Sequence, residues 1–346
     1  MRRNPNVIIL MIFSMAILFS CRRSIPTLSG DWKHQASFIG QARQYPVLFV
    51  IGNYAYVGTG YSPLTQTWWS DFYAYNTMTD QWTQIANFPG TPRQEAVAFA
   101  VGGKGYVGCG YYGKNLQYLR DFYSYDPIAN VWAQVDSLPG PPRKGSSAFV
   151  LNDTAYVGTG LTVDTANRQL TRQDFSKFDP TTKHWYPKAS FSGPKVFGAF
   201  SFVLNNTSYL AGGYSNAISN RFTYQYFPGQ NKWIKKSNLD SNINNLPRGE
   251  TVSFVIQGAN NVNFAYVATG ASSFNGGLSD CYQYNSAQDT WIQYNSFEGG
   301  SRSGAVGFSV PGTTGYRAYL GLGGIGSTAF DDWWSFNPDV PQIINN

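Results

Sequence analysis

Six basic residues recur at one place in a repeating pattern. Most of them lie 11 residues after a Trp, and the set is Arg43, Arg93, Arg143, Lys195, Arg248 and Arg302. A guanidinium group is a planar fork that pairs with carboxylates through two hydrogen bonds. If these side chains surround one opening, they could bind an anionic or carboxylate-bearing ligand.

A matching acidic series offers a structural alternative. Its members stand four residues before a recurrent aromatic, at Asp71, Asp121, Asp174, Asp280 and Asp332. The fourth repeat has Phe222 at this place, and it is also the repeat with Lys195 instead of Arg. Loss of both members together indicates that Arg and Asp pair across two strand spacings, about 10 Å of backbone. We favour pairing for the Arg residues, and Lys195 is the member predicted to lack a partner.

Residues suited to catalysis are few. Only His34 and His184 are present, which is too few for a multi-histidine metal site. No nucleophile elbow or phosphate-binding loop is found, so the sequence predicts no metal and no cofactor. An acid or base in the channel could come from Glu95, Glu250 or Lys195.

The elements that position these residues follow from a repeat of about 50 residues. The repeated Trp residues are Trp32, Trp82, Trp132, Trp185, Trp233 and Trp291. Each of the last five follows an aromatic by seven residues, as Trp82 follows Tyr75. Every repeat also contains a Tyr-led glycine motif such as Tyr56-Val-Gly-Thr-Gly60. A period of this length is typical of a propeller blade.

Each repeat divides into four short strands. The first two are joined by minimal turns such as Asn152-Asp153, whose residues accept the positive φ that two-residue hairpins require. We therefore predict an all-β, six-bladed β-propeller of four-stranded antiparallel blades. The last repeat has no Trp strand of its own, so residues 31–38 are expected to complete it and close the ring.

The Tyr-led glycine motif, the aromatic and the Trp together resemble the kelch repeat across residues 32–338. A full Gly-Gly pair stands in register only at Gly212-Gly213. The chain is also similar to N-acetylneuraminate epimerases in its number of blades and in the segment Phe88-Pro-Gly-Thr-Pro-Arg93. That resemblance implies sugar chemistry on the face that carries the Arg series.

The same face carries aromatic residues in long connections between the second and third strands. We predict ligand contacts there from Trp68, Trp69, Tyr111, Tyr112 and Tyr214. Loops on a rigid scaffold commonly carry binding residues. Packing of these rings over the ends of the blades is an equally good interpretation.

The N-terminus reads as a targeting segment. Arg2 and Arg3 precede an apolar run from Val7 to Phe19, as in a signal peptide. The run ends at Cys21 in a pattern that resembles the lipobox of bacterial lipoproteins. We therefore expect a signal peptide at 1–20, a tether at 21–30, the propeller at 31–340 and a short tail at 341–346. The protein would be an exported lipoprotein, periplasmic or at the outer membrane or cell surface, attached to the membrane through Cys21.

Two functions remain open from the sequence. The formal charge falls from +6 to +4 without Arg2 and Arg3, which is too small to indicate a nucleic-acid partner. We expect a monomer that acts as a non-catalytic module binding a glycan or an exported protein. The alternative is a metal-free sugar epimerase or mutarotase, similar to N-acetylneuraminate epimerase.

Overall fold

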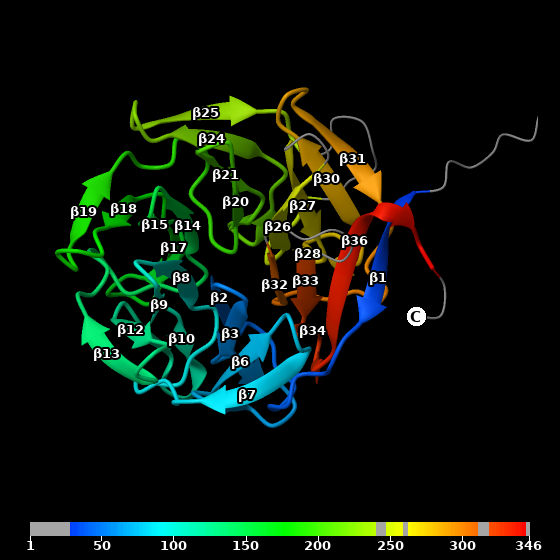
Figure 1. Ribbon diagram of the computed structural model, residues 1–346. Helices are drawn as coiled ribbons and strands as arrows, with labels where there is room; N and C mark the ends of the chain where they lie inside the picture. The colour runs from blue at the N-terminus through cyan, green and yellow to red at the C-terminus, as the bar shows by residue number, and fades with distance from the viewer. Residues whose placement is uncertain (1–27, 240–246, 259–261, 311–317, 344–346) are drawn as a thin grey trace, which may run out of the picture.

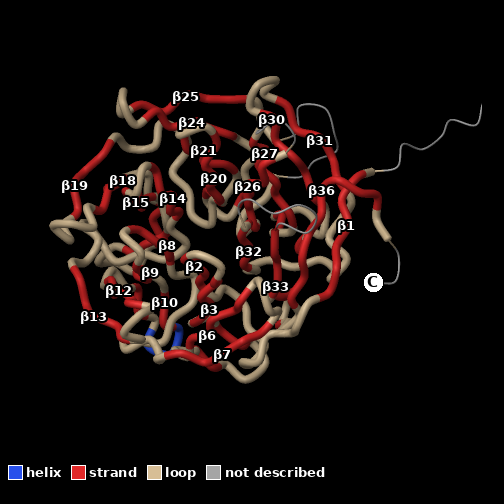
Figure 2. Tube along the Cα trace, in the orientation of Figure 1, coloured by secondary structure: helices blue, strands red, loops and turns tan. Residues whose placement is uncertain are grey.

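Six four-stranded sheets lie around a central channel (Figure 1). The computed structural model describes residues 28–239, 247–258, 262–310 and 318–343. All the sheets are antiparallel, and strands account for almost all regular structure in the described residues (Figure 2). The predicted six-bladed propeller is confirmed. No helix among the described residues is long and apolar enough to span a membrane. Residues 1–27, with the predicted signal peptide and Cys21, lie outside the described part.

The first three blades follow one plan. Blade one contains β2 (Val47–Ile51), β3 (Tyr54–Gly58), β6 (Phe72–Asn76) and β7 (Gln81–Ile85). Blade two contains β8 (Val97–Val101), β9 (Lys104–Gly108), β12 (Phe122–Asp126) and β13 (Val131–Val135). Blade three contains β14 (Ser147–Leu151), β15 (Thr154–Gly158), β18 (Phe175–Phe178) and β19 (Trp185–Lys188).

The other three blades repeat this plan. Blade four contains β20 (Phe200–Leu204), β21 (Thr207–Ala211), β24 (Thr223–Phe227) and β25 (Lys232–Lys236). Blade five contains β26 (Val252–Gln257), β27 (Asn263–Ala268), β30 (Cys281–Asn285) and β31 (Thr290–Tyr294). Blade six contains β32 (Val306–Ser309), β33 (Ala318–Gly321), β36 (Trp333–Pro341) and β1 (Ser29–His34).

Each connection between the second and third strands folds into a small two-stranded ribbon. The ribbons are β4 (Tyr61–Ser62) with β5 (Thr67–Trp68), β10 (Tyr111–Tyr112) with β11 (Gln117–Tyr118), β16 (Leu161–Val163) with β17 (Gln169–Thr171), β22 (Tyr214–Ser215) with β23 (Ile218–Ser219), β28 (Ala271–Ser272) with β29 (Gly276–Gly277), and β34 (Gly324–Ile325) with β35 (Thr328–Ala329). A single 3₁₀ turn, η1 (Gly113–Asn115), joins β10 to β11.

The N-terminal strand closes the ring as predicted. β1 lies beside β36 and pairs with it antiparallel (Figure 1). In this pairing Trp32 lies opposite Phe336. The Trp32 ring is fully buried and its centroid lies 4.5 Å from that of Phe336. The pairing covers the outer edge of β36, which would otherwise present unpaired backbone groups to solvent.

The repeated Trp and aromatic residues join neighbouring blades. Trp82 of blade one donates a hydrogen bond through Nε1 to the carbonyl oxygen of Ala36, which follows β1. Tyr75 donates to Asp80, and the Asp80 carboxylate accepts from the backbone N–H of Ala36. Because these residues hold adjacent blades together, they recur in nearly every repeat.

Candidate active site at the channel mouth

Five buried Arg residues fix the backbone around one end of the channel. The Arg43 side chain is fully buried and binds Asp71 through both terminal nitrogens, at 2.6 and 2.9 Å. Arg43 also donates to the carbonyl oxygen of Thr59 at 2.9 Å. Each of the four equivalent pairs likewise has a fully buried Arg: Arg93 with Asp121, Arg143 with Asp174, Arg248 with Asp280, and Arg302 with Asp332. These contacts match the structural interpretation of the series, and the five guanidinium groups offer no exposed surface to a ligand.

Lys195 does not occupy the place predicted for it. The backbone position equivalent to Arg143 belongs to Val196. Its carbonyl oxygen accepts a hydrogen bond from the N–H of Gly160 in the preceding blade, as that of Arg143 does from Gly110. Val196 is buried and belongs to the same apolar cluster as Phe222. Blade four therefore replaces the whole ion pair by two apolar side chains. Lys195 is exposed and lines a separate polar cavity with Arg172 and Ser190.

A second ring of residues lies two positions after the first and surrounds the channel mouth. Its members are Tyr45, Glu95, Gly145, Gly198, Glu250 and Gly304, and all have left-handed φ values between 50° and 62°. Five of them donate a backbone N–H hydrogen bond to the carbonyl oxygen of the ring member in the preceding blade, at 2.8 to 3.3 Å. Glycine is the residue best suited to this conformation.

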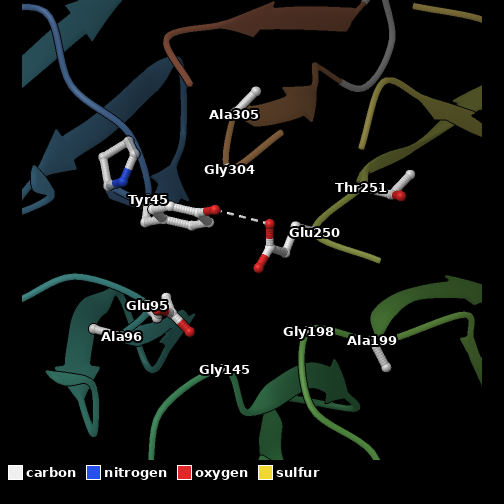
Figure 3. A pocket seen from close by; sticks show the side chains of 11 residues that line it. Tyr45, Glu95, Ala96, Gly145, Gly198, Ala199, Glu250, Thr251, Gly304 and Ala305 are labelled. Atoms are coloured by element: carbon white, nitrogen blue, oxygen red, sulfur yellow. Dashed lines mark hydrogen bonds between the residues drawn. The ribbon is translucent and has the colours of Figure 1, made fainter. Parts of the chain in front are cut away.

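Three blades place a side chain where the backbone favours glycine. An L-residue in this conformation costs about 1–2 kcal/mol, so Tyr45, Glu95 and Glu250 strain the fold. Their side chains converge on one cavity of about 140 Å³ (Figure 3). The intervening glycines make room, because a Cβ at Gly304 would lie 2.6 Å from the Tyr45 ring. Left-handed φ values also recur at Thr59 and its equivalents in other blades, so the convergence of the three side chains on one cavity, rather than strain alone, marks the site.

Glu250 is the group at the mouth whose pKa is brought close to neutral pH by its environment. Tyr45 reaches across Gly304 and donates its hydroxyl to Glu250 Oε2 at 2.9 Å (Figure 3). Burial, together with the nearby charge of Glu95, raises the pKa of Glu250 to about 7. Burial also raises the pKa of Tyr45, which keeps its proton for this hydrogen bond. Glu250 can therefore gain or lose a proton near neutral pH.

Glu95 has a different set of partners. Its Oε1 lies 2.7 Å from Nζ of Lys144 and accepts a hydrogen bond from Gln94 at 3.2 Å. Burial opposes the charge of Lys144, but the carboxylate of Glu95 outweighs it and raises the pKa of that ammonium group. The Tyr111 ring lies 5.1 Å from Lys144 Nζ, and Trp68 donates to Gln94 at 2.9 Å. Two of the predicted aromatics thus support Glu95 indirectly.

The remaining predicted aromatics pack over the blade ends. The Trp69 ring lies 5.4 Å from the guanidinium of Arg43, and Tyr112 contacts Trp68 edge to face. Tyr214 covers Gly249, where a Cβ would lie 2.3 Å from the ring. Its hydroxyl donates to the carbonyl oxygen of Ala271 at 2.8 Å.

The structure brings together Glu95 and Glu250, two of the three acid or base candidates, and leaves Lys195 outside. Tyr45 and Lys144 were missed by sequence reasoning. Aligning the residues two places after the Arg series would have found Tyr45, because this column reads Tyr, Glu, Gly, Gly, Glu, Gly. Among the described residues, no group of three or more His, Cys, Asp or Glu is placed to hold a metal ion.

The fold and this mouth define a six-bladed β-propeller with a carboxyl pair at one end of its channel. No protein-family profile matches the chain, and no curated protein matches it in sequence. A solved structure titled "Structure of YjhT" is similar with a TM-score of 0.70 and 17% sequence identity. The similarity covers 86% of this chain and 95% of the other. At this identity the likeness establishes the fold alone.

Proposed function

We propose that the protein is an acid–base catalyst that interconverts the anomers of a sugar, as a mutarotase does. The observation that supports this function is the unlike pair of carboxyl groups at the mouth. Glu95 is ion-paired with Lys144, whereas Glu250 has a pKa of about 7 and is hydrogen-bonded to Tyr45. Two carboxyl groups in such different surroundings are suited to act as base and acid.

The proposed reaction needs one proton removed and one supplied. Glu95 takes the proton from the anomeric hydroxyl, and protonated Glu250 gives its proton to the ring oxygen. The bond between the anomeric carbon and the ring oxygen then breaks to leave an open-chain carbonyl. Rotation about the bond between the anomeric carbon and the next carbon turns the other face of the carbonyl toward the former ring oxygen. Glu250 then takes back its proton from that oxygen, Glu95 returns its proton to the carbonyl oxygen, and the ring closes as the other anomer. Tyr45 holds the Glu250 carboxyl toward the cavity.

The test is to compare Glu250→Gln with the unaltered protein in an exchange NMR assay of anomer interconversion. Loss of one proton-transfer group is expected to reduce kcat about 10²-fold or more. In the unaltered protein kcat should fall as the pH rises above about 7, because Glu250 must be protonated to act as the acid. The glutamine variant should lack this limb of the pH profile.

Asp153→Asn is the matched control. It also replaces a carboxyl group by an amide, but in an exposed hairpin turn between β14 and β15. Its activity should be unchanged. An unaltered protein that binds sugars without speeding anomer exchange would favour the non-catalytic binding module instead.

We also propose that the protein is exported and anchored by lipid at Cys21. The support is the apolar run that ends at this residue. Cys21→Ser should move the protein from the membrane to the soluble fraction after cell fractionation. Retention of the variant in the membrane, together with no lipid on the unaltered protein by mass spectrometry, would contradict the anchor.

A further inference from the structure

We propose that the sugar accepted at the channel mouth is uncharged, and that sugar acids are discriminated against. This inference rests on the proposed function, because it concerns the substrate of the same site. It is carried by the distribution of charge around the cavity.

The cavity wall is acidic. Glu95 and Glu250 both line it, and among the described residues no Lys or Arg does. The ammonium group of Lys144 contacts a lining carboxylate, that of Glu95, at 2.7 Å. A substrate carboxylate would therefore lie near one or two negative charges and near a cation that already has a partner.

The Arg residues that the sequence places on this face are ion-paired with Asp residues and do not line the cavity. The five Arg side chains of the buried series are fully buried against Asp residues. The sixth position is the apolar Val196. Two cations do meet at a cavity of about 220 Å³ lined by Arg172 and Lys195, but this cavity shares no lining residue with the mouth.

The groups at the mouth suit hydroxyl groups. Carboxylate oxygens accept hydrogen bonds from hydroxyls, and the two Glu side chains supply such acceptors. A neighbouring cavity of about 280 Å³ is lined by Leu161, Phe197 and Asn216, among others. Phe197 precedes Gly198 of the mouth ring, and Leu161 pairs through its backbone with Lys144. This cavity adds apolar and amide surface, and no cation among the described residues lines it. Its Thr171 also lines the cavity of Arg172 and Lys195, where Arg172 is ion-paired with Asp174 at 3.0 Å.

The experiment uses two pairs of sugars that differ only at C6. Galactose is compared with galacturonate and glucose with glucuronate, with N-acetylneuraminate as a third acid. Anomer exchange and binding are measured by NMR with the purified protein. Repulsion between unit charges several ångströms apart near a protein surface should favour binding of each neutral sugar about tenfold at pH 8, where the Glu250 carboxyl is ionised. Glu95→Gln and Glu250→Gln should each reduce the ratio of the dissociation constant of the sugar acid to that of its neutral partner.

The outcomes separate this inference from the proposed function. Faster exchange of an acid than of its neutral partner, or of N-acetylneuraminate than of every neutral sugar, would overturn the inference and leave the catalytic proposal standing. Binding of the neutral sugars in preference to the acids, without exchange, would support the inference and overturn catalysis. Binding of no sugar would overturn both.

Discussion

Two rings of residues lie at one end of the propeller, and in each blade their members are separated by a single residue in the sequence. The two rings differ in how strictly their residues repeat from blade to blade. The first, which we call the Arg ring, is the series that begins at Arg43. It has Arg in five blades, and each of these Arg side chains is buried against an Asp. The mouth ring has one backbone conformation in all six blades, but its side chains are glycine in three and Tyr or Glu in three. Repetition therefore marks residues that hold every blade, and departure from repetition marks residues that act once.

Electrostatics distinguishes the rings as well. In the Arg ring each charge meets its opposite at hydrogen-bond distance, as Arg93 meets Asp121 at 2.8 Å. In the mouth ring two like charges approach one another, and the proximity of Glu95 helps to raise the pKa of Glu250. The first arrangement neutralises each buried charge, whereas the second brings two carboxyl groups together at an energetic cost.

The largest effect is expected from breaking one ion pair. Arg93→Ala leaves Asp121 without its partner, and loss of one member of a buried pair typically costs about 3–5 kcal/mol. Arg93→Val combined with Asp121→Phe copies the apolar pair Val196 and Phe222 of blade four. We expect this double variant to regain most of the loss, because well-packed apolar residues can replace a buried ion pair.

Denaturant unfolding of the single and double variants measures this difference. A double variant that loses as much as the sum of Arg93→Val and Asp121→Phe would show that the two positions do not interact. That result would remove the structural explanation of the Arg ring.

The sequence was sufficient for five of the six positions of the first ring and insufficient for the second. The Trp period, the closure by Trp32 and the joint loss of Arg and Asp in blade four all reflect contacts repeated in many blades. Lys195 was assigned to the Arg ring because it is charged, although it lies only 10 residues after Trp185. Val196 has the correct spacing of 11 residues, the same as that from Trp32 to Arg43. Tyr45 is visible in the repeat only as a departure from glycine, and Lys144 occurs once, so the repeat does not predict it. Their roles depend on which blades face each other across the channel.

The smallest effect concerns the cost of the mouth ring itself. Glu250 has φ of 55° and a buried carboxyl group, so Glu250→Gly removes both the strained backbone and the charge. The folded carboxyl binds its proton more tightly than the unfolded one, so its contribution to stability is lost as the pH rises from about 4.5 toward about 7. Relief of strain alone is expected to stabilise the variant by about 1 kcal/mol, offset in part by loss of the Tyr45 hydrogen bond.

The gain should therefore be larger at pH 8, where the unaltered carboxyl is charged, than at pH 5, where it is protonated. Thermal unfolding at both pH values measures this difference. The matched control is Gly145→Ala in the same ring, which adds a Cβ at φ of 60° and 3.2 Å from the backbone nitrogen of Gly198. This control should lose about 1 kcal/mol or more at both pH values, because the new side chain is strained in either case. If Glu250→Gly instead destabilises the protein by more than the control at pH 8, then Glu250 stabilises the channel mouth. The contrast between a stabilising ring and a ring maintained for chemistry would then fail.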